Sequence, residues 1–190
     1  MKLYLIRHGR TEASEKHLYC GSTDLPLSAS GAEEVKRLAL QGIYPDMSGC
    51  AVYTSGMLRA DETLGLILGR VDRAVIPELR EMDFGAFEMH SYDELKENTD
   101  YIAWISGDNE KNVCPGGESG ELMTRRVKIA LDRLLSEGRD ALVVSHGGPI
   151  AAIMAMLFPE EGKNRYQWQP SPGRGYAVSA DGKSGSYTEI

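Results

Sequence analysis

The feature that most constrains the fold is a pattern that occurs twice: an apolar stretch that stops abruptly at a histidine followed by a glycine. Residues 2–6 (KLYLI) run into Arg-His-Gly around His8, and residues 141–144 (ALVV) run into Ser-His-Gly around His146. Both stretches are typical of buried strands, and the second has the all-apolar composition of a central strand in a parallel sheet. Because ligands bind where the C-terminal ends of such strands meet, we expect the two histidines at one edge of one sheet.

The rest of the chain alternates between strand and helix patterns. Further strands are expected at residues 51–54 and 74–77, and a closing hairpin at 174–180 and 185–189 around Asp181-Gly182. Helices are expected from a Ser28 cap to Gly42, from a Ser55 cap to Gly69, over the apolar face of residues 123–134 to Gly138, and between Pro149 and Pro159. This alternation predicts an α/β doubly wound three-layer sandwich, with a mostly parallel sheet and helices on both faces.

Residues 79–112 break this pattern. Short helices are plausible at 92–97 and 100–105, but no long strand or helix fits. An irregular stretch of this length inside a compact domain is usually functional. We therefore predict a single domain over residues 1–190 with a small inserted lid at about 79–112.

Composition excludes several classes of protein. The net charge of −7, with no basic tract, argues against a nucleic-acid partner. No apolar run approaches the roughly 20 residues needed to cross a bilayer, so no membrane association is expected. The three cysteines contain no CxxC and are expected to be free thiols in a reducing compartment, which predicts a cytoplasmic location. The sequence gives no indication of the oligomeric state.

Three short motifs together resemble the histidine phosphatase superfamily, the phosphoglycerate-mutase-like group. They are RHG at residues 7–9, EMDFG at 81–85 and SHG at 145–147, and the resemblance runs over nearly the whole chain. The resemblance implies a metal-independent phosphomonoester hydrolase without a cofactor, acting through a phosphohistidine intermediate. Its partner would be a small phosphate monoester, such as α-ribazole 5′-phosphate, a sugar phosphate or a phosphoglycerate.

Phosphoryl transfer through histidine needs a neutral imidazole, cations around the phosphoryl oxygens, and an acid for the leaving oxygen. The resemblance implies that His8 is the nucleophile and that Arg7 and Arg59 clamp the phosphate. It also implies that His146 donates to a phosphoryl oxygen and that Glu81 is the proton donor and acceptor. Arginine suits the clamp because its planar fork matches phosphate oxygens.

Two further positions are expected to contact the phosphate. Gly147 begins a helix, so its backbone N–H can face an anion. Ser14 stands where many family members have an asparagine, and its shorter side chain reaches less far. Asp83 is the local competitor of Glu81 for the acid role. We favour Glu81 because the resemblance aligns it with the family's carboxylate ahead of the phenylalanine-glycine pair.

Two departures from the family pattern bear on the substrate. Arg10 stands where Glu or Gln is usual, which adds a positive charge expected near the site and favours a more acidic substrate. Met89 stands where a glycine is usual, and a methionine here also occurs in some α-ribazole phosphatases.

Three alternatives use the same residues. A phosphomutase of the phosphoglycerate mutase type shares the site, although such mutases are longer than 190 residues. A non-catalytic phosphate-binding protein on this fold would usually lack one of the core residues. A metallohydrolase using His8, His146, Glu81 and Asp83 has no HExxH or other metal spacing in its favour.

Overall fold

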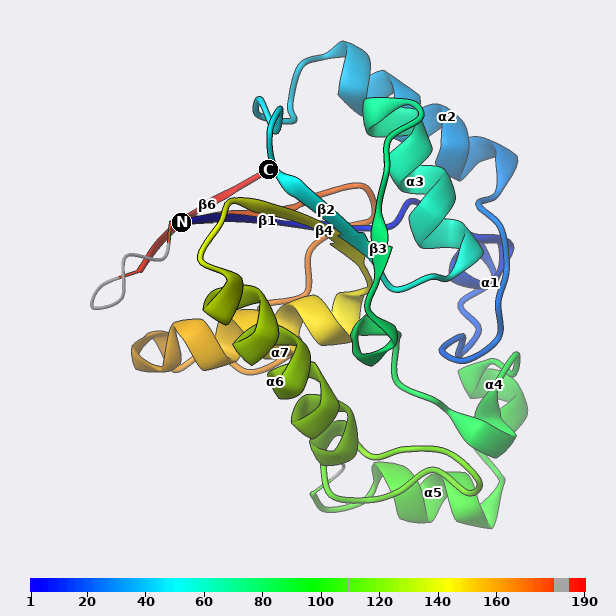
Figure 1. The fold of residues 1–190 in the computed structure, drawn as a ribbon. Helices are drawn as coiled ribbons and strands as arrows, with labels where there is room; N and C mark the ends of the chain where they lie inside the picture. The colour runs from blue at the N-terminus through cyan, green and yellow to red at the C-terminus, as the bar shows by residue number, and fades with distance from the viewer. Residues whose placement is uncertain (109, 180–184) are drawn as a thin grey trace.

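The apolar strands predicted from the sequence form the centre of one sheet. The computed structural model describes residues 1–108, 110–179 and 185–190, and within these ranges the sheet has six strands in the order β3-β2-β4-β1-β5-β6 (Figure 1). The strands are β1 (Lys2–Arg7), β2 (Ala51–Thr54), β3 (Ala74–Val75), β4 (Ala141–Ser145), β5 (Gly175–Ser179) and β6 (Ser186–Glu189). β1, β2, β3 and β4 pair in parallel, whereas β5 and β6 are antiparallel additions at one edge. The predicted mostly parallel α/β sandwich is confirmed.

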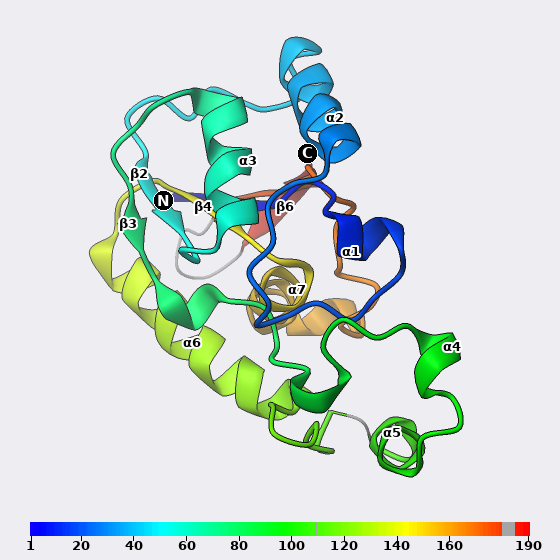
Figure 2. The ribbon, with the colours of Figure 1, turned by 90° about the vertical axis from the view of Figure 1, so that its right-hand side faces the viewer.

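Helices cover both faces of the sheet. The α-helices of the described residues are α1 (Glu12–Glu15), α2 (Ala29–Leu40), α3 (Leu58–Leu68), α4 (Tyr92–Leu95), α5 (Thr99–Ile105), α6 (Gly120–Glu137) and α7 (Gly147–Leu157). α2 and α3 lie on one face and α6 and α7 on the other (Figure 2). Successive residues of β1 alternate between the two cores, since Leu5 clusters with residues of α6 and α7 and Ile6 with residues of α3.

The helix caps follow the sequence signals with one exception. The Ser28 side chain accepts the N–H of Gly31 at the start of α2, as predicted. Ser55 was expected to cap the next helix, and this expectation is wrong. The chain first turns at Gly56, whose φ is +77°, and α3 begins only at Leu58 without a side-chain cap. The Ser55 hydroxyl is thereby left to bond a different partner, described below.

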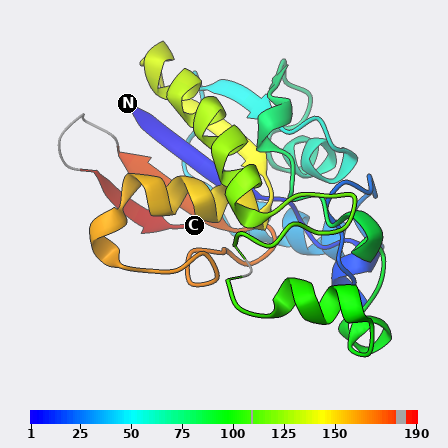
Figure 3. The same ribbon diagram turned by 90° about the horizontal axis from the view of Figure 1, so that it is seen from below.

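The irregular segment and the hairpin largely match expectation. Residues 79–112 contain only short helices, among them α4 and α5, and these lie beyond the sheet beside the start of α6 (Figure 3). β5 and β6 form the predicted antiparallel pair, while the predicted turn at Asp181-Gly182 lies outside the described residues. Within the described ranges, every helix is too short or too polar to cross a lipid bilayer.

Candidate active site

The C-terminal ends of β1 and β4 bring the two histidines together. β1 and β4 are paired in register, with Arg7 beside Ser145, so His8 and His146 leave the sheet side by side. Their ring centroids are 5.0 Å apart in an edge-on arrangement, and both residues are buried. The meeting of the two histidines at one sheet edge is as the repeated pattern predicted.

The environment of His8 keeps its imidazole neutral. Nδ1 lies 2.6 Å from the carbonyl oxygen of Gly9. A carbonyl only accepts, so Nδ1 carries the proton and Nε2 keeps its lone pair. Burial lowers the pKa of His8 well below its ordinary value, and the positive charges of Arg59 and Arg7 lower it further. A neutral ring with a free Nε2 lone pair is the form that a nucleophile requires.

Arg59 lies in the first turn of α3 and is fully buried beside His146. It donates to the carbonyl oxygens of Gly21 (2.8 Å) and Thr23 (2.9 Å), and its Nε donates to Nδ1 of His146 (3.2 Å). Because an arginine N–H only donates, Nδ1 of His146 is the acceptor. Nε2 then carries the proton and donates to the Ser55 hydroxyl at 2.8 Å.

Burial is also the main cause that lowers the pKa of His146 well below its ordinary value, with His8 and Arg59 adding to the effect. His146 is therefore neutral in this arrangement, with both ring nitrogens engaged. Ser55 is a site residue that the sequence reasoning missed. Its position was a usable signal, because Ser55 directly follows β2 just as His8 and His146 follow β1 and β4.

Arg7 holds its guanidinium at the same edge. Its side chain donates to the carbonyl oxygen of Pro170 at 2.8 Å, and its buried Nε has no hydrogen-bond partner among the described residues. Neither Arg7 nor Arg59 forms an ion pair in the described part of the chain, and all their hydrogen-bond acceptors are neutral. Two guanidinium groups whose hydrogen-bond acceptors are all neutral, beside a neutral histidine, make a site for an anion.

Glu81 reaches this edge from the irregular segment. Its carboxylate accepts the N–H of Gly148 at 3.1 Å and the N–H of Met82 at 2.9 Å. A side chain at position 148 would place its Cβ 2.3 Å from the carboxylate, so only glycine allows this approach. Arg126 of α6 donates to the backbone oxygen of Glu81 at 2.8 Å.

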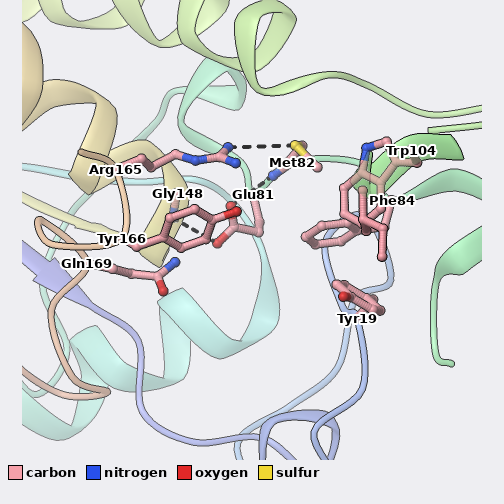
Figure 4. Close-up of a pocket in the computed structure, with 10 residues that line it drawn as sticks. Tyr19, Glu81, Met82, Phe84, Trp104, Gly148, Arg165, Tyr166 and Gln169 are labelled. Atoms are coloured by element: carbon pink, nitrogen blue, oxygen red, sulfur yellow. Dashed lines mark hydrogen bonds between the residues drawn. The ribbon is translucent and has the colours of Figure 1, made fainter. Parts of the chain in front are cut away.

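Two pockets meet at Glu81. We call one the histidine pocket, which is lined by Arg7, His8, Thr11, Ser14, His17, Leu18, Tyr19, Cys20, Arg59 and Glu81. We call the other the aromatic pocket, which is lined by Tyr19, Glu81, Met82, Phe84, Trp104, Ile105, Gly148, Arg165, Tyr166 and Gln169. Figure 4 shows Tyr166 and Glu81 facing Tyr19, Phe84 and Trp104 across the aromatic pocket. An acid between a cationic pocket and an apolar one is placed to protonate a group that spans both.

The other predicted positions are less directly engaged. Ser14 lines the histidine pocket, but its hydroxyl is bonded to the backbone of Thr11 in a capping box at the start of α1. Gly147 is the buried first residue of α7. Asp83 lines neither pocket and instead accepts from the Gly85 N–H and the Ser22 hydroxyl.

Arg10 does not add its charge to the site as expected. Its side chain is exposed and pairs with Glu34 of α2 at 3.3 Å, and it lines neither pocket. The metallohydrolase alternative also finds no support, since the described residues contain no group of three or more His, Cys, Asp or Glu side chains placed to hold a metal.

Comparison with known proteins gives a consistent result. Residues 3–188 match the family model for the histidine phosphatase superfamily (branch 1). The chain is 36% identical over 165 residues to the adenosylcobalamin/α-ribazole phosphatase of Escherichia coli strain K12, covering 83% of this chain and 79% of that protein. The crystal structure of the α-ribazole phosphatase from Shigella flexneri superposes with a TM-score of 0.87 at 30% identity, covering 100% of this chain and 96% of that chain. A 2,3-bisphosphoglycerate-dependent phosphoglycerate mutase from Xanthobacter autotrophicus is 29% identical over 171 residues, covering 82% of this chain and 80% of that protein.

Proposed function

The chain belongs to branch 1 of the histidine phosphatase superfamily, and from that premise we propose that it hydrolyses α-ribazole 5′-phosphate through a phosphohistidine on His8. Its general activity, phosphatase chemistry on a small phosphorylated metabolite, follows from the family and its phosphatase relatives. The identity of the substrate and the roles of individual residues are the proposal.

In the first step, Nε2 of His8 attacks phosphorus, and the bond from phosphorus to the ester oxygen breaks as the P–N bond forms. Arg7 and Arg59 hold the phosphoryl oxygens, on which the negative charge develops. Neutral His146 already carries a proton on Nε2, which donates a hydrogen bond to a phosphoryl oxygen in place of the Ser55 hydroxyl. Glu81 gives its proton to the leaving oxygen, producing the alcohol.

In the second step, water attacks phosphorus and the P–N bond breaks. Glu81, now a carboxylate, takes the proton from the attacking water, and inorganic phosphate and neutral His8 are released. The position of Glu81 at the junction of the two pockets supports both proton transfers, because leaving oxygen and attacking water occupy the same side of the phosphorus in turn.

The observation that carries the choice of substrate is the aromatic pocket. α-Ribazole 5′-phosphate joins its phosphate through ribose to a flat dimethylbenzimidazole. With the phosphate between the two arginines, the base would extend past Glu81 among the rings of Tyr19, Phe84, Trp104 and Tyr166. Aromatic side chains stack on such bases, whereas ribose phosphates and phosphoglycerates offer nothing to stack.

The test is a comparison of kcat/KM for α-ribazole 5′-phosphate and ribose 5-phosphate. Stacking of a base is worth about 1–3 kcal/mol, so we expect a preference of about 10- to 100-fold for the nucleotide. Equal values for the two substrates would refute the proposed leaving-group site while leaving the phosphatase activity in place.

Two further assays separate the enzymatic alternatives. Phosphatase activity on an aryl phosphate is expected to be the same with and without EDTA, whereas a metallohydrolase would lose it. With 3-phosphoglycerate, a mutase would form 2-phosphoglycerate, and we expect only slow release of inorganic phosphate.

The three cysteines are all unpaired, which supports the predicted cytoplasmic location.

A further inference from the structure

The Glu88 carboxylate lies half-buried against the loop formed by residues 21–23. It accepts the backbone N–H groups of Gly21 (2.9 Å), Ser22 (2.9 Å) and Thr23 (3.2 Å), and also the Thr23 hydroxyl (2.7 Å). The N–H of Phe84 adds a further bond at 3.0 Å. A single carboxylate therefore binds every backbone N–H of this short loop.

The opposite side of the same loop holds Arg59. The two terminal nitrogens of the Arg59 guanidinium donate hydrogen bonds to the carbonyl oxygens of Gly21 and Thr23. The loop thus lies as a layer of backbone between the Glu88 carboxylate and the Arg59 guanidinium, with N–H groups facing the first and C=O groups facing the second.

Residues 82–90, which carry Glu88 and which we call the stem, are fixed relative to this loop. A Cβ at Gly21 would lie 1.6 Å from the carbonyl oxygen of Met82, so the two backbones are in direct contact. Beyond Glu88, the N–H of Met89 donates to the Tyr19 oxygen at 2.7 Å and the N–H of Tyr19 to the His90 oxygen at 3.0 Å. The two segments are therefore held together by backbone contacts on both sides of Glu88.

Glu88 is charged under ordinary conditions. Burial by itself would raise the pKa of Glu88, but the hydrogen bonds from Thr23, Phe84 and Ser22 outweigh burial and hold the pKa below its ordinary value. The acceptor that the loop amides need is thus present throughout the neutral pH range.

We propose that Glu88 is a positioning residue that sets the phosphate clamp by orienting the carbonyl oxygens of residues 21–23 toward Arg59. Neutral carbonyls fix the guanidinium without cancelling its charge, which keeps that charge for the substrate. Arg126 shows the alternative, because its guanidinium pairs directly with the Glu118 carboxylate at 2.7 Å. The inference rests on the proposed role of Arg59 in binding phosphate.

The experiment is competitive inhibition by inorganic phosphate in a Glu88→Gln variant. The new amide NH₂ would face backbone N–H donors, so the loop must shift and Arg59 loses its acceptors. We expect Ki for phosphate to rise by about 10-fold or more, because charge-assisted hydrogen bonds that hold the loop are lost. kcat/KM should fall for both α-ribazole 5′-phosphate and an aryl phosphate, since both substrates depend on the Arg59 clamp.

Glu137→Gln is the matched control. Glu137 also accepts several hydrogen bonds, from Tyr53 and Arg139, but it ends α6 on the N-terminal side of β4, away from the site. Its substitution is expected to lower the melting temperature without raising Ki. An equal Ki in both variants would overturn the inference, because the loss would then be one of stability alone.

Arg59→Ala and the double variant distinguish this inference from the proposed function. If Arg59→Ala binds phosphate as tightly as the wild type, the proposed phosphate site is wrong. If Arg59→Ala raises Ki, Glu88→Gln should add little in that background, since it acts through Arg59. Full additivity would overturn the positioning role.

Should Glu88→Gln fail to fold, Thr23→Val removes only the hydroxyl bond to Glu88 and should still raise Ki several-fold. An unchanged Ki would count against the inference.

Discussion

The histidine pocket and the aromatic pocket share Glu81 and Tyr19 but are built in different ways. The charged and imidazole groups of the histidine pocket come from the end of β1 and the first turn of α3, namely Arg7, His8 and Arg59, and they are fixed by hydrogen bonds to backbone carbonyl oxygens. The aromatic pocket is formed largely by side chains from loops and from the short helix α5, and its rings are fixed by packing on one another, as between Trp104 and Phe84, whose ring centroids lie 6.2 Å apart. On the proposed function, phosphoryl transfer and the choice of substrate therefore occupy structurally separable halves of one site.

The largest expected effect tests the histidine half. In His8→Ala no nitrogen is left to form the P–N bond, so we expect kcat to fall by at least about 10⁴-fold for every substrate. Circular dichroism and thermal melting should show that the fold is kept. Turnover near the wild-type rate would refute His8 as the nucleophile.

The next effect tests the junction of the halves. Glu81→Gln removes the proton that the leaving oxygen needs, so we expect kcat for α-ribazole 5′-phosphate to fall by about 10²- to 10⁴-fold. The first step with p-nitrophenyl phosphate should suffer far less, because its leaving phenolate is stable without a proton, and a burst of p-nitrophenol would show this. Asp83→Asn is the control for the competing carboxylate, and a loss equal to that of Glu81→Gln would assign the acid to Asp83 instead.

A smaller effect should be confined to the aromatic half. Tyr166→Ala removes an exposed ring from the wall opposite Trp104, and we expect kcat/KM for α-ribazole 5′-phosphate to fall by about 10-fold. kcat/KM for ribose 5-phosphate and Ki for inorganic phosphate should stay unchanged. Tyr92→Ala provides a control, because Tyr92 is equally an exposed tyrosine but lines neither pocket. A parallel loss for both substrates would show that the two halves are not separable.

The smallest effect concerns stability alone. Met89 has a φ of +61°, a left-handed conformation that costs a residue with a Cβ about 1 kcal/mol. This conformation explains why glycine is the usual residue at this position. Met89→Gly should raise the free energy of unfolding by up to about 1 kcal/mol in urea titrations, with kcat/KM unchanged. A decrease in stability would mean that side-chain packing of Met89 outweighs the backbone cost.

The sequence predicted those parts of the site that follow from strand ends. The apolar runs before His8 and His146 predicted that the two rings meet at one edge of one sheet. Ser55 was assigned wrongly because serine before a helix and a polar residue after a strand are competing signals at the same position. The structure resolves the competition, since the turn at Gly56 delays the helix and leaves the Ser55 hydroxyl to His146.

Glu88 could not be found from the sequence for a different reason. Its partners in the loop of residues 21–23 lie 65–67 positions earlier in the chain. Local spacing can predict a bond to a nearby backbone amide, as in a helix cap, but it does not encode one to an amide so far away. The same holds for Arg126, which donates to the backbone oxygens of Glu78, Arg80 and Glu81. Such contacts exist only once the irregular segment has folded against the sheet.

The backbone pairing of residues 18–19 with residues 89–91 has a consequence for how enzymes of this kind can diverge. We expect chain beyond Ser91, including α4 and α5, to tolerate changes that keep the contacts of α5 with Tyr19. A one-residue insertion between Met82 and Glu88 would instead carry the carboxylate out of reach of its amides. New substrate ranges should therefore evolve by remodelling residues 92–112, with the stem before them held at constant length.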